Sequence, residues 1–332
     1  MGGVNYLKRR CRELVNFSGT WRQKLIYVKH GFSVLIFVAI IYLAWDSRDL
    51  LVLTLSSANY ILLILTLILL ISINFILPAG SVFLLGSFGA SLSYKKALNA
   101  HIVCLPARYL PGSIWHSVGK MAHYRSHGIV LARLTIFVCL ENLITIGGAF
   151  ILGGGCVSYF RGLHDSWGRV AGLAAVMGVL GIIVTSCITN WYVSKQINDN
   201  FSFMLFLKSF ICYTIGCAIF GFVFSLYMLS LLSSGNRLNI VETGGTYIFS
   251  WAIGFVSLFT PQGLGVTEFI TGILLTVHLP NSSLAVLVAG FRVIRLISDM
   301  CIWIIYSIFL KFMQMNSKYT DENIPIQTDV QV

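Results

Sequence analysis

Charged residues are scarce in this sequence: Asp, Glu, Lys and Arg make up 11% of its 332 residues, whereas hydrophobic residues make up 57%. A soluble domain carries about 25% charged residues, so this chain cannot present a wetted surface on all sides. Lipid is the solvent that fits most of it. The net charge of +11 then concerns membrane topology and anionic lipid. Because the basic residues flank apolar runs, no nucleic-acid partner is expected.

The motifs of common catalytic and metal sites are also missing. The chain has no Walker A loop, no HExxH pair and no nucleophile elbow. Its eight cysteines form no CxxC or other metal spacing, and most lie in apolar runs, where cysteine acts as a small hydrophobe. The glycines at 153–155 mark either close helix packing or the end of a span. We expect no enzyme, no metal, no cofactor and no disulfide framework.

Long apolar runs are the dominant feature. Each has about the 20 residues that cross roughly 30 Å of hydrocarbon, although the first reaches that length only when extended back to residue 25. The runs cover residues 32–45, 61–85, 134–156, 170–191, 203–232 and 284–310. We predict an all-α polytopic membrane protein with about six full spans and no cleaved signal peptide. Its predicted parts are a basic leader (1–24), a membrane domain (25–312) and a disordered tail (313–332).

Two further apolar segments contain helix breakers. The segment 97–118 holds two prolines and a glycine, and the segment 246–279 holds the sequence PQGLG at 261–265. Proline and glycine interrupt helices. Interrupted helices at membrane depth are tolerated where protein or a water-filled cavity surrounds them. We therefore predict that both segments form re-entrant hairpins lining an interior; the alternative for the second is two short, tilted spans.

Basic residues are unevenly distributed among the loops. They gather in the leader, in the stretch between the second and third runs, and in the tail, whereas the alternate loops hold few. By the positive-inside rule, both termini lie in the cytoplasm and the chain crosses the cytoplasmic membrane several times. The order of two runs, a broken segment and one run occurs twice, and the two halves begin on opposite sides. This order predicts an inverted-topology repeat whose hairpins meet near the midplane.

A few charged residues lie within the apolar runs, where each costs about 2.5–3.5 kcal/mol on insertion scales. Glu141 lies in the third run. Arg292, Arg295 and Asp299 lie in the last run, and their i, i+3, i+7 spacing places them on one helix face. Arg295 is predicted to pair with Asp299. Arg292 is then left to pair with Glu141 or Glu268, or to hold a lipid phosphate; the alternative is a buried structural ion network without a ligand.

Polar residues in and beside the broken segments complete the candidate site. Arg108 is expected either to bind a lipid headgroup or to snorkel to the interface. Trp115 and His116 are expected to line a cavity or to lie in the interfacial aromatic belt. Lys120 is predicted to be an interface anchor. Glu268 follows a glycine break at which a helix begins, so it either caps that helix or helps its N-terminus to hold a phosphate.

Four motifs together resemble a known family. They are YLPGSIWHSVGKMAHYRSHGI at 109–129, LEN at 140–142, FTPQGLGVTEF at 259–269 and AGFRVIRLISDM at 289–300. In order and spacing they resemble the membrane region of lysylphosphatidylglycerol synthases and its stand-alone relatives, the flippase-like integral membrane family. The family's motif positions that this chain matches are Pro111, Gly112, Trp115, Glu141, Pro261, Gly263, Gly265, Glu268, Arg292 and Asp299. One departure is Thr267, where many relatives have a basic residue.

The resemblance implies that the chain moves lipid between membrane leaflets. In the full-length synthases the membrane region moves aminoacylated phospholipid that a separate soluble domain makes. No soluble domain follows the last run here, so aminoacyl transfer is not expected. Stand-alone members resembling this chain accompany surface-glycan and lipid-linked sugar pathways.

We therefore expect a flippase for an anionic lipid or lipid-linked glycan, acting alone or as a homodimer. In this hypothesis Arg108 and Arg292 hold the phosphate, while Glu141, Glu268 and Asp299 fix the arginines or exchange protons. The alternative is an accessory membrane subunit that transports nothing and supports a glycosyltransferase or synthase in cell-envelope polysaccharide biosynthesis.

Overall fold

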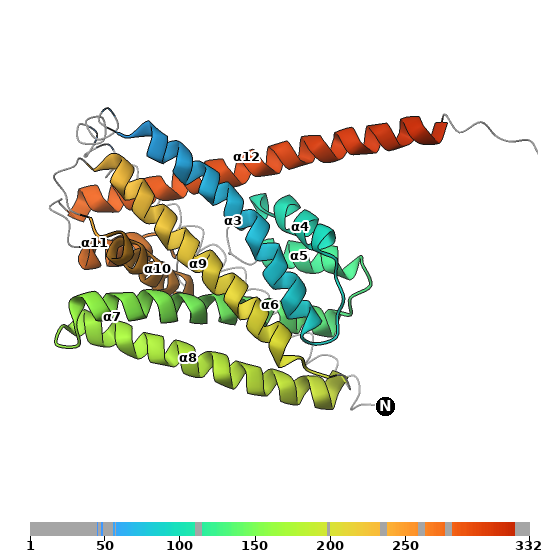
Figure 1. Cartoon of the computed structure of the whole chain (residues 1–332), viewed down its shortest axis with the longest axis horizontal. Coiled ribbons are helices and arrows are strands. Elements are labelled where there is room, and N and C mark those ends of the chain that lie inside the picture. The colour runs from blue at the N-terminus through green and yellow to red at the C-terminus, as the bar shows by residue number, and fades with distance from the viewer. Residues whose placement is uncertain are drawn as a thin grey trace, which may run out of the picture.

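The computed structural model describes residues 45, 48, 56, 58–109, 115–197, 200–232, 238–257, 263–275 and 281–322, with side chains of the last helix described from 284 to 312. Within these ranges the regular elements are all helices (Figure 1). The helices long and apolar enough to cross a membrane cover Tyr60–Gly86, Leu131–Arg161, Ser166–Lys195, Phe203–Leu231 and Leu284–Phe312. They confirm the prediction of an all-α polytopic membrane protein. The predicted leader (1–24) and residues 32–44 of the first run lie outside the described residues.

The elements follow one another in the order that the sequence predicts. They are α3 (Tyr60–Gly86), α4 (Tyr94–Val103), the 3-10 turn η1 (Pro106–Tyr109), α5 (Trp115–Arg125), α6 (Leu131–Ala149), the π-helical η2 (Phe150–Gly154), α7 (Gly155–Arg161), α8 (Ser166–Tyr192), the π-helical η3 (Val193–Ile197), α9 (Phe203–Leu231), α10 (Ile240–Val256), α11 (Val266–Leu274) and α12 (Asn281–Glu322). The last helix, α12, extends through Glu322, so residues 313–322 of the predicted tail (313–332) are helical. They contain no proline or glycine to end the helix.

The third predicted run is one continuous helix, built from α6, η2 and α7. Two glycines in its π-helical part allow other backbones to come very close. A Cβ atom on Gly153 would lie 2.5 Å from the backbone nitrogen of Phe249, and one on Gly154 would lie 2.5 Å from the carbonyl oxygen of Ala171. These glycines therefore mark close packing against α10 and α8 rather than the end of a span.

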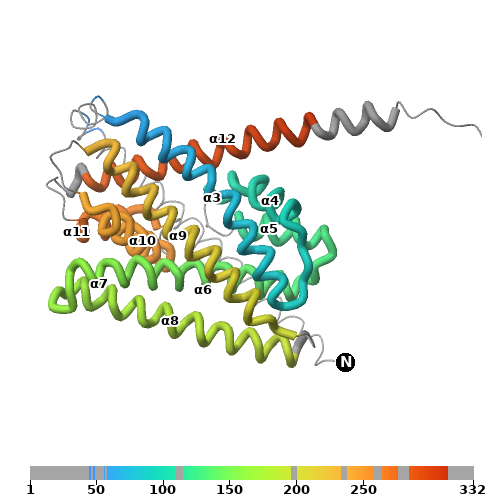
Figure 2. Tube along the Cα trace, in the orientation of Figure 1, coloured from blue at the N-terminus to red at the C-terminus, as the bar shows by residue number. Residues whose placement is uncertain are grey.

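Helices α3 and α9 form the centre of the bundle and run antiparallel, side by side, along their whole length (Figures 1 and 2). Backbone hydrogen bonds join them at both ends, because Asn59 donates its N–H to the carbonyl of Ser230 (2.7 Å) and Ser202 donates to that of Ser87 (2.8 Å). Antiparallel orientation is what an inverted repeat requires of two equivalent helices.

The remaining helices pack in matched pairs around this centre. In the first half, α4 packs against α3 and α5, and α5 packs against α6; in the second, α10 packs against α9 and α11, and α11 packs against α12. Across the halves, α6 packs against α9 as α12 packs against α3. The packing therefore has the pattern of the predicted inverted-topology repeat. The sequence predicts the run 32–45 as the counterpart of α8 in the first half; residues 32–44 of it lie outside the described residues.

Asp165 caps the N-terminus of α8. Its side chain accepts hydrogen bonds from the backbone N–H groups of Trp167 (3.0 Å) and Gly168 (3.1 Å), and Arg161 lies 3.6 Å away. The bond from Gly168 is the main cause that lowers the pKa of Asp165 below its ordinary value of 3.8, and Arg161 adds to it. An ionised carboxylate is therefore the better cap.

We expect Asp165→Ala to lower the thermal unfolding midpoint in detergent near neutral pH. Because the pKa of Asp165 is lowered in the folded state, its ionised carboxylate stabilises the fold above pH 3.8. This stabilisation is lost as the pH falls through the folded-state pKa. The deficit of the alanine variant should therefore shrink in acid. Asp165→Asn is the control, because an amide oxygen caps at every pH; a deficit of the alanine variant that does not change with pH would argue against a charged cap.

Candidate functional site

The last span places three charged residues in its middle part and on one face. Arg292 contacts the second hairpin: its Nε lies 2.8 Å from Oε1 of Glu268, and its Nη2 donates to the carbonyl of Gly263 (3.2 Å). Glu268 is one of the two partners predicted for Arg292, whereas Glu141 lies elsewhere in the protein. The ion pair joins α11 to α12, and both side chains are largely buried.

Asp299 contacts the first hairpin. Its Oδ2 accepts hydrogen bonds from Nη1 of Arg108 (2.9 Å) and from the hydroxyl of Tyr109 (2.8 Å), and its Oδ1 accepts one from Asn74 (3.3 Å). The predicted pair of Asp299 with Arg295 is therefore wrong, because the 3-10 turn η1 supplies a tertiary partner instead. Arg108 pairs with Asp299 in the middle part of α12 and does not snorkel to the interface.

A chain of hydrogen bonds extends from Asp299 to a buried histidine. Asn74 donates to the carbonyl of Leu70 as well as to Asp299, which fixes its amide orientation and turns its Oδ1 towards Nε2 of His101 (3.1 Å). His101 therefore donates from Nε2, and its buried Nδ1 has no hydrogen-bond partner among the described residues. His116, the candidate histidine, donates from Nδ1 to the carbonyl of Cys104 (2.9 Å) and closes the first hairpin. Sequence analysis did not identify Asn74 or His101 as members of this network.

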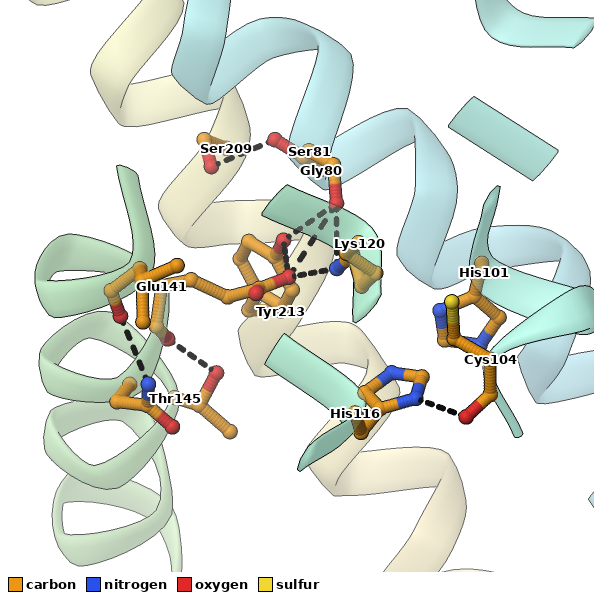
Figure 3. Close-up of polar contacts among 12 residues, drawn as sticks. Gly80, Ser81, His101, Cys104, His116, Lys120, Glu141, Thr145, Ser209 and Tyr213 are labelled. Atoms are coloured by element: carbon orange, nitrogen blue, oxygen red, sulfur yellow. Dashed lines mark hydrogen bonds and ion pairs between the residues drawn. The ribbon is translucent and has the colours of Figure 1, made fainter. Parts of the chain in front are cut away.

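Lys120 and Glu141 form a second buried network, between α5 and α6 (Figure 3). Lys120 is only 1% exposed, and its Nζ lies 2.5 Å from Oε1 of Glu141. The same oxygen accepts hydrogen bonds from the hydroxyls of Tyr213 (2.7 Å) and Ser81 (3.3 Å). The prediction that Lys120 is an interface anchor is therefore wrong. The sequence did contain a signal that Lys120 points into the protein. Its i, i+4 spacing from His116 places both side chains on one face of the helix.

The second hairpin turns back at two glycines with left-handed backbone angles, Gly263 (φ +70°) and Gly265 (φ +83°). A Cβ atom on Gly263 would lie 2.5 Å from the carbonyl carbon of Gly254, so the two arms touch backbone to backbone. Helix α11 has 9 residues and is about 13 Å long, too short to cross about 30 Å of hydrocarbon. The short second arm therefore favours the re-entrant hairpin over two short spans.

Glu268 acts as a cap and as an ion-pair partner together. Its Oε2 accepts a hydrogen bond from the backbone N–H of Gly265 (2.7 Å), while Oε1 faces Arg292. Thr267, the departure from the family motif, donates its hydroxyl to the carbonyl of Gly263 (3.2 Å) and so fastens the turn.

The two halves repeat one arrangement with the charges exchanged. In each half, the second arm of the hairpin pairs with the span that follows it. In the first half the arm carries the cation Lys120 and the span carries Glu141; in the second the arm carries Glu268 and the span carries Arg292. Glu141 therefore holds a lysine and not an arginine, which corrects its predicted role.

Arg295 has no acidic partner among the residues that the structure describes. Its guanidinium carbon lies 4.4 Å from the ring centroid of Phe220, a cation–π distance. Trp115 is 47% exposed, which favours the interfacial belt over a buried lining position. The candidates Pro111, Gly112 and Pro261 lie outside the described residues. The described part of the chain contains no group of three or more His, Cys, Asp or Glu residues that could hold a metal ion.

The sequence matches no protein-family model, and no curated protein matches it either. Fold and site together define the class: a multi-pass helical membrane protein in which two helical hairpins are fastened by ion pairs to one span. The lipid-flippase resemblance remains a prediction from the motifs.

Proposed function

We propose that this protein translocates a lipid or lipid-linked glycan with a phosphate headgroup across the cytoplasmic membrane. The observation that carries the proposal is that both hairpins are fastened to α12, one through Arg108 and Asp299 and the other through Glu268 and Arg292. The two contact points are seven residues apart, about 10 Å along the helix. Ionisable groups at such depth are costly and typically mark a substrate pathway.

The chemistry of these groups suits a phosphate. A guanidinium presents five N–H donors in a planar fork that matches phosphate oxygens, and a carboxylate partner sets its orientation. Exchange of a carboxylate contact for a phosphate contact at Arg108 or Arg292 would loosen one hairpin from α12. Substrate binding would thus be coupled to opening of the site towards one leaflet, as in carriers built from inverted repeats.

The test is reconstitution of purified protein into vesicles that carry trace amounts of fluorescent lipids of several headgroup classes. We expect faster movement of at least one phosphate-bearing lipid between leaflets than in protein-free vesicles. A folded, reconstituted protein that moves none of them would count decisively against translocation.

An accessory role is favoured by a different observation, namely that each of the three central carboxylates has a cationic partner, as in a structural ion network. Such a subunit would hold a glycosyltransferase or synthase and transport nothing. The double variant Arg108→Gln/Asp299→Asn removes one pair without leaving a charge behind. A translocator should lose transport in this variant, whereas an accessory subunit should keep its partner and support normal glycan or lipid synthesis.

A further inference from the structure

The charges at the centre of the protein do not balance. The three ion pairs that fasten the hairpins, taken together with Arg295, contain four cations and three carboxylates: Arg108, Lys120, Arg292 and Arg295 against Glu141, Glu268 and Asp299. Three ion pairs use all three carboxylates. The surplus is one positive charge, and it resides on Arg295.

Arg295 lies between the two hairpin contacts on α12. It follows Arg292 by three residues and precedes Asp299 by four, so it shares their face of the helix. Its guanidinium lies over the ring of Phe220 in α9, and that ring also contacts Tyr247 of α10. Arg295 therefore points from α12 towards α9, one of the two central helices of the bundle.

The surroundings of Arg295 leave its charge uncompensated. The described residues supply a ring face, that of Phe220, but no carboxylate. A cation–π contact offsets only part of the cost of removing a guanidinium from water. A permanent cation within an apolar span, with five N–H donors and no acidic partner among the described residues, is a site prepared for an anion that comes from outside the chain.

We infer that Arg295 is the residue that neutralises the substrate, and that the substrate is a lipid phosphodiester with one negative charge. This inference rests on the proposed function and deepens it. A phosphodiester supplies one negative charge and balances the surplus. A phosphate monoester carries about −1.5 to −2 at pH 7, and a pyrophosphate carries still more, so either would leave the centre negative. Arg108 and Arg292 donate hydrogen bonds to the phosphate, while Asp299 and Glu268 balance the charges of these two arginines.

The experiment compares three fluorescent substrates in phosphatidylcholine vesicles that contain the full-length protein. They are phosphatidylglycerol, a polyprenyl sugar phosphodiester and the corresponding polyprenyl sugar pyrophosphate. Quenching of the outer leaflet by dithionite gives the rate of movement. We expect the wild type to move at least one phosphodiester faster than the pyrophosphate. Comparison of the two phosphodiesters then shows whether the substrate is a phospholipid or a polyprenyl-linked sugar. Faster movement of the pyrophosphate would overturn the charge argument.

Arg295→Gln should lower the rate for the preferred phosphodiester at least about tenfold, because a charge-assisted hydrogen bond to the substrate is lost. Arg295→Lys should retain much more of the activity, since it keeps the charge. Arg133→Gln is the matched control and should leave the rate unchanged. Arg133 lies at the start of α6 and donates an exposed hydrogen bond to the carbonyl of Gly89. Equal rates for the wild type and Arg295→Gln would overturn the inference.

Stability separates a ligand role from a structural one. Arg295→Gln removes a charge without a partner and should keep or raise the thermal unfolding midpoint, whereas Arg292→Gln strands Glu268 and should lower it. A lowered midpoint for Arg295→Gln would assign Arg295 to the structure and overturn the inference. If the wild type moves no lipid, the proposed function fails by itself, and binding decides the inference. Equal affinity of detergent-solubilised wild type and Arg295→Gln for fluorescent phosphatidylglycerol would then refute it.

Discussion

Lys120→Met is expected to destabilise the protein by about 3–5 kcal/mol, because it leaves Glu141 as a buried carboxylate without its cation. Methionine is close to lysine in length and fills the space between α5 and α6, so the loss reports the charge rather than a cavity. The hydroxyls of Tyr213 and Ser81 still donate to Glu141, but neither carries a compensating charge. The measurement is the thermal or denaturant unfolding midpoint of the purified protein in detergent.

The double variant Lys120→Met/Glu141→Gln should recover most of this loss, because replacement of both members of a buried pair leaves no stranded charge. Lys95→Met is the matched control, since Lys95 is exposed on α4 and its loss should change stability little. A single variant as stable as the control would show that Lys120 does not compensate Glu141.

Gly263→Ala should be similarly disruptive, with a loss of about 2–5 kcal/mol from two additive causes. The left-handed backbone (φ +70°) costs a residue with a Cβ atom about 1–2 kcal/mol. The Cβ would also lie 2.5–2.7 Å from three backbone atoms of Gly254, and overpacking of this kind costs about 1–3 kcal/mol. Because the carbonyl of Gly263 also accepts from Arg292, we expect the variant to lose lipid movement as well.

Gly128→Ala separates the two causes. Gly128 has a comparable backbone angle (φ +88°), but a Cβ atom there would meet nothing within 4 Å. This control should therefore show only the smaller, conformational loss and should keep its activity. Equal losses of stability in the two variants would mean that the arms of the second hairpin are not in backbone contact.

The spans could be predicted from sequence because their signal is local. The helix α3 covers Tyr60–Gly86, where the apolar run covers 61–85. The third run (134–156) was predicted shorter than the helix, which covers 131–161. Only the tertiary structure shows that Gly153 and Gly154 allow α10 and α8 to pack closely against it. The hairpins were recognisable because proline and glycine interrupt apolar segments, and such breaks are tolerated at membrane depth only inside protein or beside a cavity.

The ion pairs were predictable only in part, because pairing depends on which elements meet. Glu268 was a candidate for Arg292, but nothing in the sequence says which hairpin packs against that part of α12. The local i, i+4 pair of Arg295 with Asp299 was the natural choice, and it is displaced because Arg108 approaches from 191 residues away in the chain. Partners that distant leave no trace in local spacing.

The hydrogen bonds that join α3 and α9 at both ends have a mechanical consequence. Neither helix can slide along the other without breaking the Asn59–Ser230 and Ser202–Ser87 bonds. Between these bonds, nearer the Ser202–Ser87 end, the ring of Tyr213 fits against Gly80. The two helices therefore form one rigid unit. In the proposed translocation, the hairpins and outer helices would therefore move about this pair of helices, which itself stays fixed.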